Sequence, residues 1–353
     1  MKNLIQKFIF ILAVSASLFS CSDDTQTIAK FPTIVEIATA DPANFSILKD
    51  ALVKTGLDVT LNTPGSYTVF APTNAAFTTA GISSAYINAL TAPADNVAIA
   101  NLKQVLLYHV IGIGTRANDL IANNATGITG YTKTFANTTT TSTLKLSMFV
   151  NKVGTDVLIN GGATNGGAKV TTADIDASNG VVHVIDNVLG LPTILKLTIA
   201  NPDYSTLVSI VTSTGGTFGD QTAVKNALAA ATATAPLTLN TPNNAAFTSA
   251  LDLANGGFIP AAPTAAQVTT LLKYHVISGN RLKSYFTEGL VTNTITSPVQ
   301  TVKSLIAGTG GARLEDKGSI TPVIRNISVF KINDIQAVNG VIHTIDKVLQ
   351  PVL

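Results

Sequence analysis

Apolar residues recur with helical spacing in three segments of the chain. Their members are Phe45, Leu48 and Leu52; Leu102, Leu106 and His109; and Val268, Leu271, Leu272 and His275. Such spacing places them on one face of a helix. Asp41-Pro42 is a helix-start signal and Gly56 is a stop signal, so the first helix is predicted between them.

From about residue 128 the pattern changes to polar–apolar alternation, as in the Thr-rich run 143–148. Alternation with a period of two predicts strands, and the Asn-Gly pairs at 160, 165 and 179 predict hairpin turns. Earlier in the chain, Thr68–Phe70 predicts a short strand that Pro72 turns into a brief helix through Phe77. Helices followed by strands within one unit predict an α+β fold.

Three blocks of sequence occur twice, in the same order. Residues 67–77 recur as 237–247, residues 107–111 as 273–277, and residues 174–186 as 334–346. The separation between equivalent positions shrinks along the chain, which indicates a duplication followed by loop deletions. We therefore expect two domains of about 160 residues, at 33–192 and 193–353, which meet near Leu191-Pro192.

The first 20 residues have the pattern of a secretory signal. Lys2 and Lys7 precede an apolar run from Phe8 to Phe19, which is too short for a membrane-spanning helix. The run ends at Leu18-Phe19-Ser20-Cys21, which resembles the lipobox of bacterial lipoproteins, although Phe19 is bulkier than usual. Residues 1–20 are therefore predicted to be a lipoprotein signal peptide and Cys21 the lipidated residue; the alternative is an ordinary cleaved signal followed by an unmodified Cys.

Residues 21–32 are predicted to be a lipid-anchored tether. Ser22-Asp23-Asp24 resembles the acidic tract that sends some Gram-negative lipoproteins to the outer face of the cell. A merely polar linker is the alternative. The expected location is the cell envelope, anchored in the outer membrane by lipid and exposed at the surface, and the lipid on Cys21 is the expected membrane contact.

Composition excludes several functional classes. Hydrophobic residues make up 46% and charged residues 12% of the chain, so it can bury a core. Lys and Arg number 22 against 20 Asp and Glu, and without Lys2 and Lys7 the charges balance, which argues against a nucleic-acid partner. A single Cys excludes an intramolecular disulfide, and four His leave little material for a metal site. No cofactor is expected.

Motifs of catalysis are missing as well. The glycines at 161–162 and 166–167 precede no Gly-Lys-Ser/Thr, and neither an HExxH helix nor a Gly-x-Ser-x-Gly elbow occurs. Scattered carboxylates leave a glycosidase pair open but single none out. We expect that the protein is not an enzyme.

The three blocks together resemble the fasciclin-like domain, in two copies that cover nearly all of the mature chain. The residues that carry the motif are Pro72, Asn74, Phe77, Asn179, Gly180 and His183 in the first copy, and Pro242, Asn244, Phe247, Asn339, Gly340 and His343 in the second. The resemblance implies that each copy is a wedge-like β-sandwich with helices packed along one side. The second copy departs from the pattern at Asn240 and Asn243, which replace Phe70 and Thr73.

In animal matrix proteins of this family, a Tyr-His segment and an Asp-Ile pair have been linked to integrin binding. By resemblance, the candidate partner-binding residues are Tyr108, His109, Asp174 and Ile175, and then Tyr274, His275, Asp334 and Ile335. The alternative from the residues themselves is structural. His109 and His275 lie on apolar helix faces, His183 and His343 on Val- and Ile-rich strands, and Asp174 suits a turn.

The expected function is adhesion or interaction with a protein or extracellular matrix partner through two lipid-anchored domains. Two linked domains can add avidity without a strong single site. The alternative is a carbohydrate-binding accessory lipoprotein of an outer-membrane uptake system. The chain has no Trp and only 6% aromatic residues, but its seven Tyr could form sugar platforms.

Overall fold

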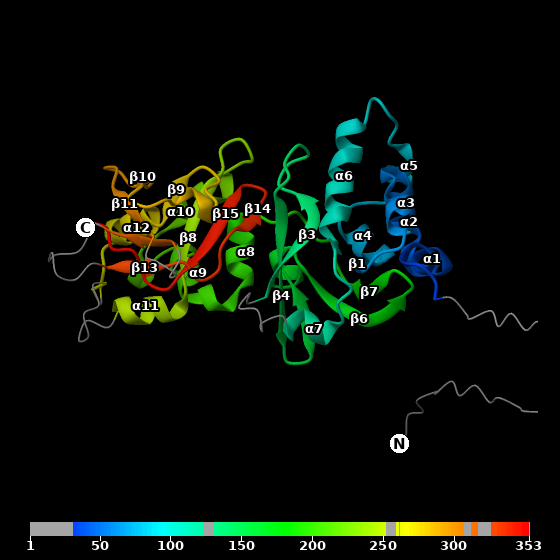
Figure 1. Cartoon of the computed structure of the whole chain (residues 1–353), viewed down its shortest axis with the longest axis horizontal. Coiled ribbons are helices and arrows are strands. Elements are labelled where there is room, and N and C mark those ends of the chain that lie inside the picture. The colour runs from blue at the N-terminus through cyan, green and yellow to red at the C-terminus, as the bar shows by residue number, and fades with distance from the viewer. Residues whose placement is uncertain are drawn as a thin grey trace, which may run out of the picture. The chain divides into compact units, whose positions relative to one another are not determined.

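The structure is a computed structural model that describes residues 31–122, 130–251, 259–260, 262–306, 312–316 and 326–352. The predicted signal peptide, Cys21 and most of the predicted tether lie outside the described residues. Residues 31–353 form one compact unit. Within it, repeat 1 comprises the elements from α1 to β7 and repeat 2 those from α8 to β15 (Figure 1).

Helices begin repeat 1, as the sequence predicts. They are α1 (Ile34–Ala40), α2 (Pro42–Thr55), α3 (Leu57–Leu61), α4 (Asn74–Thr79), α5 (Ser84–Ala89), α6 (Asn96–Tyr108) and α7 (Ala117–Ala122). The side chain of Asp41 caps α2 by accepting the Asn44 N–H at 3.2 Å. Gly56 ends α2 with a φ of 67°, a conformation that costs glycine little. Both predicted ends of this helix are confirmed.

The strands of repeat 1 close into a barrel. They are β1 (Tyr67–Pro72), β2 (Val110–Ile111), β3 (Tyr131–Asn137), β4 (Lys145–Val153), β5 (Asp156–Ile159), β6 (Ala168–Ala177) and β7 (Gly180–Ile185). Strands β1 and β7 pair in parallel and close the barrel, and the other pairs are antiparallel. The Asn179-Gly180 turn joins β6 to β7, as predicted. The α+β fold is thus confirmed, and the expected sandwich takes the form of one closed sheet.

Repeat 2 has the same order of helices and then strands. Its helices are α8 (Ile194–Ala200), α9 (Ser205–Val211), α10 (Thr222–Ala230), α11 (Asn244–Leu251) and α12 (Ala265–Tyr274), with 3₁₀ turns η3 (Pro202–Tyr204), η4 (Gly216–Phe218) and η6 (Lys283–Tyr285). Its strands are β8 (Leu237–Pro242), β9 (Val276–Ser278), β10 (Val291–Asn293), β11 (Thr301–Ile306), β12 (Ala312–Glu315), β13 (Ile327–Val329), β14 (Ile335–Ala337) and β15 (Gly340–Ile345). They form two four-stranded sheets, in the orders β10-β11-β12-β13 and β14-β15-β8-β9.

Equivalent strands of the two repeats pair in the same register. Phe70 on β1 lies opposite His183 on β7, and Asn240 on β8 lies opposite His343 on β15. Both pairs of strands are parallel and almost fully buried. The internal duplication predicted from the sequence is therefore present in the fold.

The two repeats touch within the compact unit. Strand β14 packs on β4, and the Tyr131 hydroxyl donates to the Leu197 carbonyl at 3.1 Å. The Gln336 N–H of repeat 2 donates to Ser147 Oγ of repeat 1 at 2.9 Å. Tyr131 and Phe149 of repeat 1 also join the apolar core that holds Ile194 and Leu197 of repeat 2. Polar and apolar contacts thus both link the repeats.

Candidate functional site

The first pair of histidines caps two equivalent helices. His109 follows α6, where its Nδ1 lies 2.7 Å from the Val105 carbonyl and its Nε2 accepts the Leu189 N–H at 2.9 Å. His275 follows α12 with the same arrangement, to Leu271 at 2.8 Å and to Leu349 at 2.8 Å. Because the leucine amide must donate to Nε2, the proton of each neutral ring lies on Nδ1. Burial lowers the pKa of both histidines from 6.5 to about 4.

The second pair of histidines uses the opposite tautomer. Nδ1 of His183 accepts the Asp174 N–H at 3.2 Å, so Nε2 carries the proton and donates to the Thr115 carbonyl at 3.0 Å. His343 repeats this with Asp334 at 3.3 Å and the Arg281 carbonyl at 2.7 Å. Burial also lowers the pKa of each ring. All four histidines are neutral and have both ring nitrogens engaged.

Asp174 lies at a register irregularity of β6, and Asp334 directly precedes β14. Their φ angles are 62° and 59°, a left-handed conformation that Asp tolerates better than most residues. The Asp174 carboxylate accepts the Ala117 N–H at 2.8 Å, and that of Asp334 accepts the Lys283 N–H at 2.8 Å. Each aspartate therefore holds the loop after β2 or β9. Asp174 does so from a register irregularity of β6 and not from a turn, although it accepts a backbone N–H as expected.

The Asn-Gly blocks tie the start of each repeat to its last hairpin. Asn179 Oδ1 accepts the Ile34 N–H at 3.0 Å and Asn339 Oδ1 accepts the Ile194 N–H at 2.8 Å, both at a helix start. The following glycine is needed because a Cβ at Gly180 would lie 2.0 Å from the Tyr67 carbonyl oxygen. A Cβ at Gly340 would lie 1.9 Å from the Leu237 carbonyl oxygen.

The first block supplies caps and core. Asn74 Oδ1 accepts the Ile47 N–H at 3.0 Å, and Asn244 Oδ1 accepts the Thr206 N–H at 3.0 Å. Thr73 caps α4, and the substituted residue Asn243 accepts the Ala246 N–H at 2.9 Å in the same position of α11. This departure therefore preserves the cap. The remaining motif residues Pro72 and Pro242 end β1 and β8, and Phe77 and Phe247 are buried.

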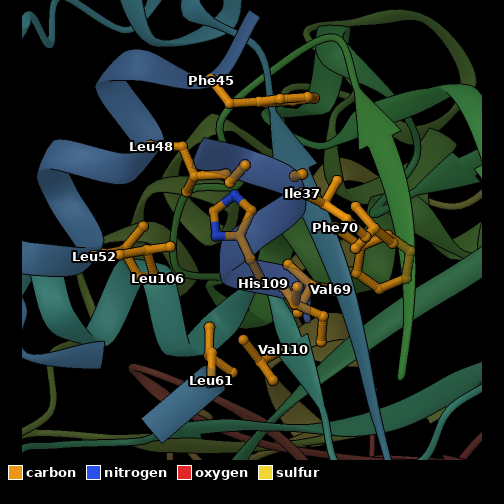
Figure 2. Close-up of a pocket in the computed structure, with 14 residues that line it drawn as sticks. Ile37, Phe45, Leu48, Leu52, Leu61, Val69, Phe70, Leu106, His109 and Val110 are labelled. Atoms are coloured by element: carbon orange, nitrogen blue, oxygen red, sulfur yellow. The ribbon is translucent and has the colours of Figure 1, made fainter. Parts of the chain in front are cut away.

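His109 borders a small apolar cavity between α2, α6 and β1 (Figure 2). Figure 2 shows its ring among Phe45, Leu48 and Leu106. The cavity has a volume of about 20 Å³, and the cavity beside His275 has about 10 Å³. Space of this size holds at most a water molecule, so neither cavity is a ligand site.

The two Tyr-His segments are inside the fold. Tyr108 is 0% exposed, and its hydroxyl donates to the Ser147 carbonyl at 2.9 Å and accepts from Asn160 at 2.9 Å. Tyr274 is also 0% exposed, and its hydroxyl donates to the Thr301 carbonyl at 2.8 Å. A partner at the surface of the folded protein cannot touch these side chains.

The two Asp-Ile pairs differ in accessibility. Asp174 and Ile175 are half-buried at the rim of repeat 1, beside an exposed ion pair of 2.7 Å between Arg116 and Asp176. Ile335 is buried, next to the contact of β14 with β4. The structure therefore brings each Asp-Ile pair beside its strand histidine, but only the pair in repeat 1 offers apolar surface.

A groove that no sequence motif indicates lies between the repeats. It has a volume of about 530 Å³ and is lined by β3 and β4 of repeat 1 and by residues 331–335 of repeat 2. Lys133 is its most unusual side chain, because burial lowers its pKa from 10.5 to about 8. No sequence motif marks this lysine.

Within the described part of the chain, no cluster of three His, Cys, Asp or Glu side chains could hold a metal ion. Over the same residues, no helix has the length and apolar character that a membrane span requires.

Comparison with known proteins identifies the repeats. The chain is 32% identical over 157 residues to protein sll1483 of Synechocystis, a match of 44% of this chain and 72% of that protein. It is 32% identical over 164 residues to the transforming growth factor-beta-induced protein ig-h3 of Sus scrofa, which covers 45% of this chain and 19% of the relative. The solved FAS1 domain pair of the insect cell adhesion molecule Fasciclin I is 19% identical, with a TM-score of 0.48, and the match covers 87% of this chain and 95% of that one. The fasciclin domain model matches residues 43–192 and 202–351, and the chain therefore belongs to the fasciclin-domain family, with two tandem copies.

Proposed function

We propose that this protein is an adhesion or interaction module held at the cell surface by lipid on Cys21. The observation that carries the proposal is that the motif residues of both repeats make hydrogen bonds within the fold. The four buried His of the repeated blocks, together with Asn179 and Asn339, all bond to the backbone of their own repeat. Because these side chains are occupied by hydrogen bonds inside the fold, we infer that surface residues bind the partner. This arrangement suits an adhesion module better than an enzyme.

The surface that we propose for a protein or matrix partner is the rim of repeat 1 at residues 174–176. It combines the half-buried Ile175 with the exposed charges of Asp176 and Arg116. The equivalent segment of repeat 2 packs against repeat 1 instead. One accessible copy per chain therefore follows, and avidity would come from many anchored chains.

The lipid anchor rests on the lipobox resemblance and on the single Cys of the chain. Acyl chains on one residue give a stable anchor, because each buried CH₂ contributes about 0.8 kcal/mol and two chains suffice. Mass spectrometry of the mature N-terminus should show an acylated Cys21. Protease shaving of intact cells should then remove the protein from the outer face, and an unmodified Cys21 would contradict the anchor.

The binding test uses purified protein coated on a surface and challenged with cells and with extracellular matrix proteins. We expect retention, and we expect Asp176→Lys to reduce it several-fold because it reverses a charge at the rim. Asp203→Lys, an equally exposed change in repeat 2, is the matched control and should retain normally. Absence of retention at high coating density would contradict the adhesion proposal.

The carbohydrate alternative has less support. Of the seven Tyr, four are buried: Tyr108, Tyr131, Tyr204 and Tyr274. Tyr285 lies under the Arg281 guanidinium at 4.5 Å from the ring centroid. Sugar platforms require exposed aromatic faces, and Tyr86 is the tyrosine with the largest exposure. Saturable micromolar binding of a polysaccharide in a calorimetric titration would reverse this ranking.

A further inference from the structure

The groove between the repeats has the size and lining of a small-molecule site. Its volume of about 530 Å³ lies within the range of roughly 300–1,000 Å³ typical of ligand pockets. Apolar side chains dominate its walls, among them Ile113, Tyr131, Val150 and Ile332. Such walls favour a ligand with an apolar body.

Lys133 provides a cationic point in this apolar groove. Its Nζ donates to Ser147 Oγ at 3.0 Å and to the Asp334 carbonyl at 2.5 Å, so two of its three N–H groups meet neutral acceptors. Among the described residues, no carboxylate oxygen lies within 4.0 Å of this nitrogen. The Asp334 carboxylate acts on the ammonium only from beyond contact distance, and the two neutral acceptors leave one donor for an anion.

The other charged side chains along the groove are already engaged. Lys331 Nζ pairs with the Asp346 carboxylate at 3.1 Å. The Asp334 carboxylate accepts the Lys283 N–H and lies 3.9 Å from Nδ1 of His343. A monoanion would therefore bind at Lys133, because the charge of Lys331 is already balanced by Asp346.

We propose that this groove binds a medium-chain fatty acid, with its carboxylate on Lys133 and its chain along the apolar walls. A single remaining ammonium donor suits a monocarboxylate, whereas a phosphate would require several donors. The contact of the carboxylate would favour the charged amine, because burial lowers the pKa of Lys133 to about 8 even though the Asp334 carboxylate raises it. Binding at pH 8 should therefore be accompanied by proton uptake.

The test is a calorimetric titration of the purified protein with decanoate and with 1-decanol, both below their aggregation limits. We expect saturable 1:1 binding of decanoate and at least tenfold weaker binding of the alcohol. At pH 8, titrations in buffers of different ionisation enthalpy should show proton uptake. Equal affinity for acid and alcohol, or binding of neither, would overturn the proposal.

Two variants separate the lysine from general effects of charge. Lys133→Met should weaken decanoate binding at least tenfold, abolish the proton uptake and leave the binding of decanol unchanged. Lys225→Met, an exposed change on α10, is the control and should bind as the original chain does. Unaltered decanoate affinity in a folded Lys133→Met variant, checked by circular dichroism, would also refute the site. The titration and the adhesion assay are separate measurements on separate variants, so failure of one proposal does not decide the other.

Discussion

The interiors of the two repeats differ at one equivalent position. In repeat 1, Phe70 is fully buried and its ring lies 5.5 Å from that of His183. In repeat 2, Asn240 occupies the same register opposite His343, also fully buried, and neither side-chain polar atom has a hydrogen-bond partner among the described residues. His343 instead packs against the rings of Phe286 and Phe330, at 5.7 and 5.0 Å.

The backbone around these two positions is nevertheless the same. The N–H of Phe70 donates to the His109 carbonyl at 2.9 Å, and that of Asn240 donates to the His275 carbonyl at 2.9 Å. The histidine and asparagine hydrogen bonds are kept in both repeats, while the side chains that fill the interior have changed. The shared hydrogen bonds thus specify the fold, whereas the apolar side chains around the strand histidine can differ. In repeat 2, Phe286 and Phe330 provide the rings that Phe70 provides in repeat 1.

The largest effect is expected for Phe70→Asn, which gives repeat 1 the residue of repeat 2. Among the described residues of repeat 1, Phe70 is the ring that packs against His183, so the change leaves a cavity and an unpaired amide. The free energy of unfolding should fall by about 5 kcal/mol, from roughly 3–5 for the lost ring and 1–3 for the amide. Urea denaturation followed by circular dichroism measures it.

Phe31→Asn is the matched control for this change. Phe31 is 64% exposed, so the same substitution should alter stability by less than about 0.5 kcal/mol. A Phe70→Asn variant as stable as the control would show that repeat 1 also tolerates the polar residue, and the contrast between the interiors would disappear.

The next largest effect is a loss of stability at acid pH, which we expect in both repeats. His109 and His275 have a pKa near 6.5 when unfolded and about 4 when folded, because burial disfavours the charged ring. The unfolded chain therefore binds more protons between these values, and stability is lost as pH falls from 6.5 towards 4. Each histidine should account for about 3 kcal/mol by pH 4. Urea midpoints at pH 7, 5.5 and 4.5 measure the slope.

His109→Gln tests whether this histidine causes the slope, since an amide can both donate and accept. The variant should be less stable at pH 7 and should lose less stability on acidification. An unchanged slope would assign the acid sensitivity to other groups. His275→Gln should behave in the same way, because the two hydrogen-bond sets match.

Local signals explain what the sequence predicted of this fold. The ends of α2 follow from Asp41 and Gly56, and the β6–β7 turn follows from Asn179-Gly180, all through contacts of a few residues. The groove could not be predicted in this way. Lys133 meets acceptors 14 and 201 positions away in the chain, and no local pattern encodes such contacts. Likewise, no periodicity distinguishes the half-buried Ile175 of repeat 1 from the buried Ile335 of repeat 2.

A smaller effect, of opposite sign, is expected for Asn240→Leu. Leu has the same branching as Asn and removes two unpaired polar atoms from the interior of repeat 2. Stability should rise by about 1–2 kcal/mol, within the usual cost of such unpaired groups. Asn243→Leu is the matched control, because it removes the cap of α11 and should cost about 1 kcal/mol. If Asn240→Leu destabilises the protein, a partner such as a buried water satisfies Asn240.

The smallest changes in stability are expected at the equivalent strand edges that hold Asp176 in repeat 1 and Gln336 in repeat 2. Ser147→Ala removes the acceptor that the buried Gln336 N–H shares with the Lys133 ammonium. Because Lys133 keeps its bond to the Asp334 carbonyl, the cost should stay at about 1 kcal/mol. Arg116→Ala removes an exposed ion pair at the free edge of repeat 1, and exposed pairs contribute little, so the urea midpoint should not move. A clear loss of stability in Arg116→Ala would mean that the free edge is itself part of the fold. The segment 174–176 would then stabilise repeat 1, as the equivalent segment 334–336 stabilises the contact between the repeats. The reason for proposing segment 174–176 as a binding surface would be lost.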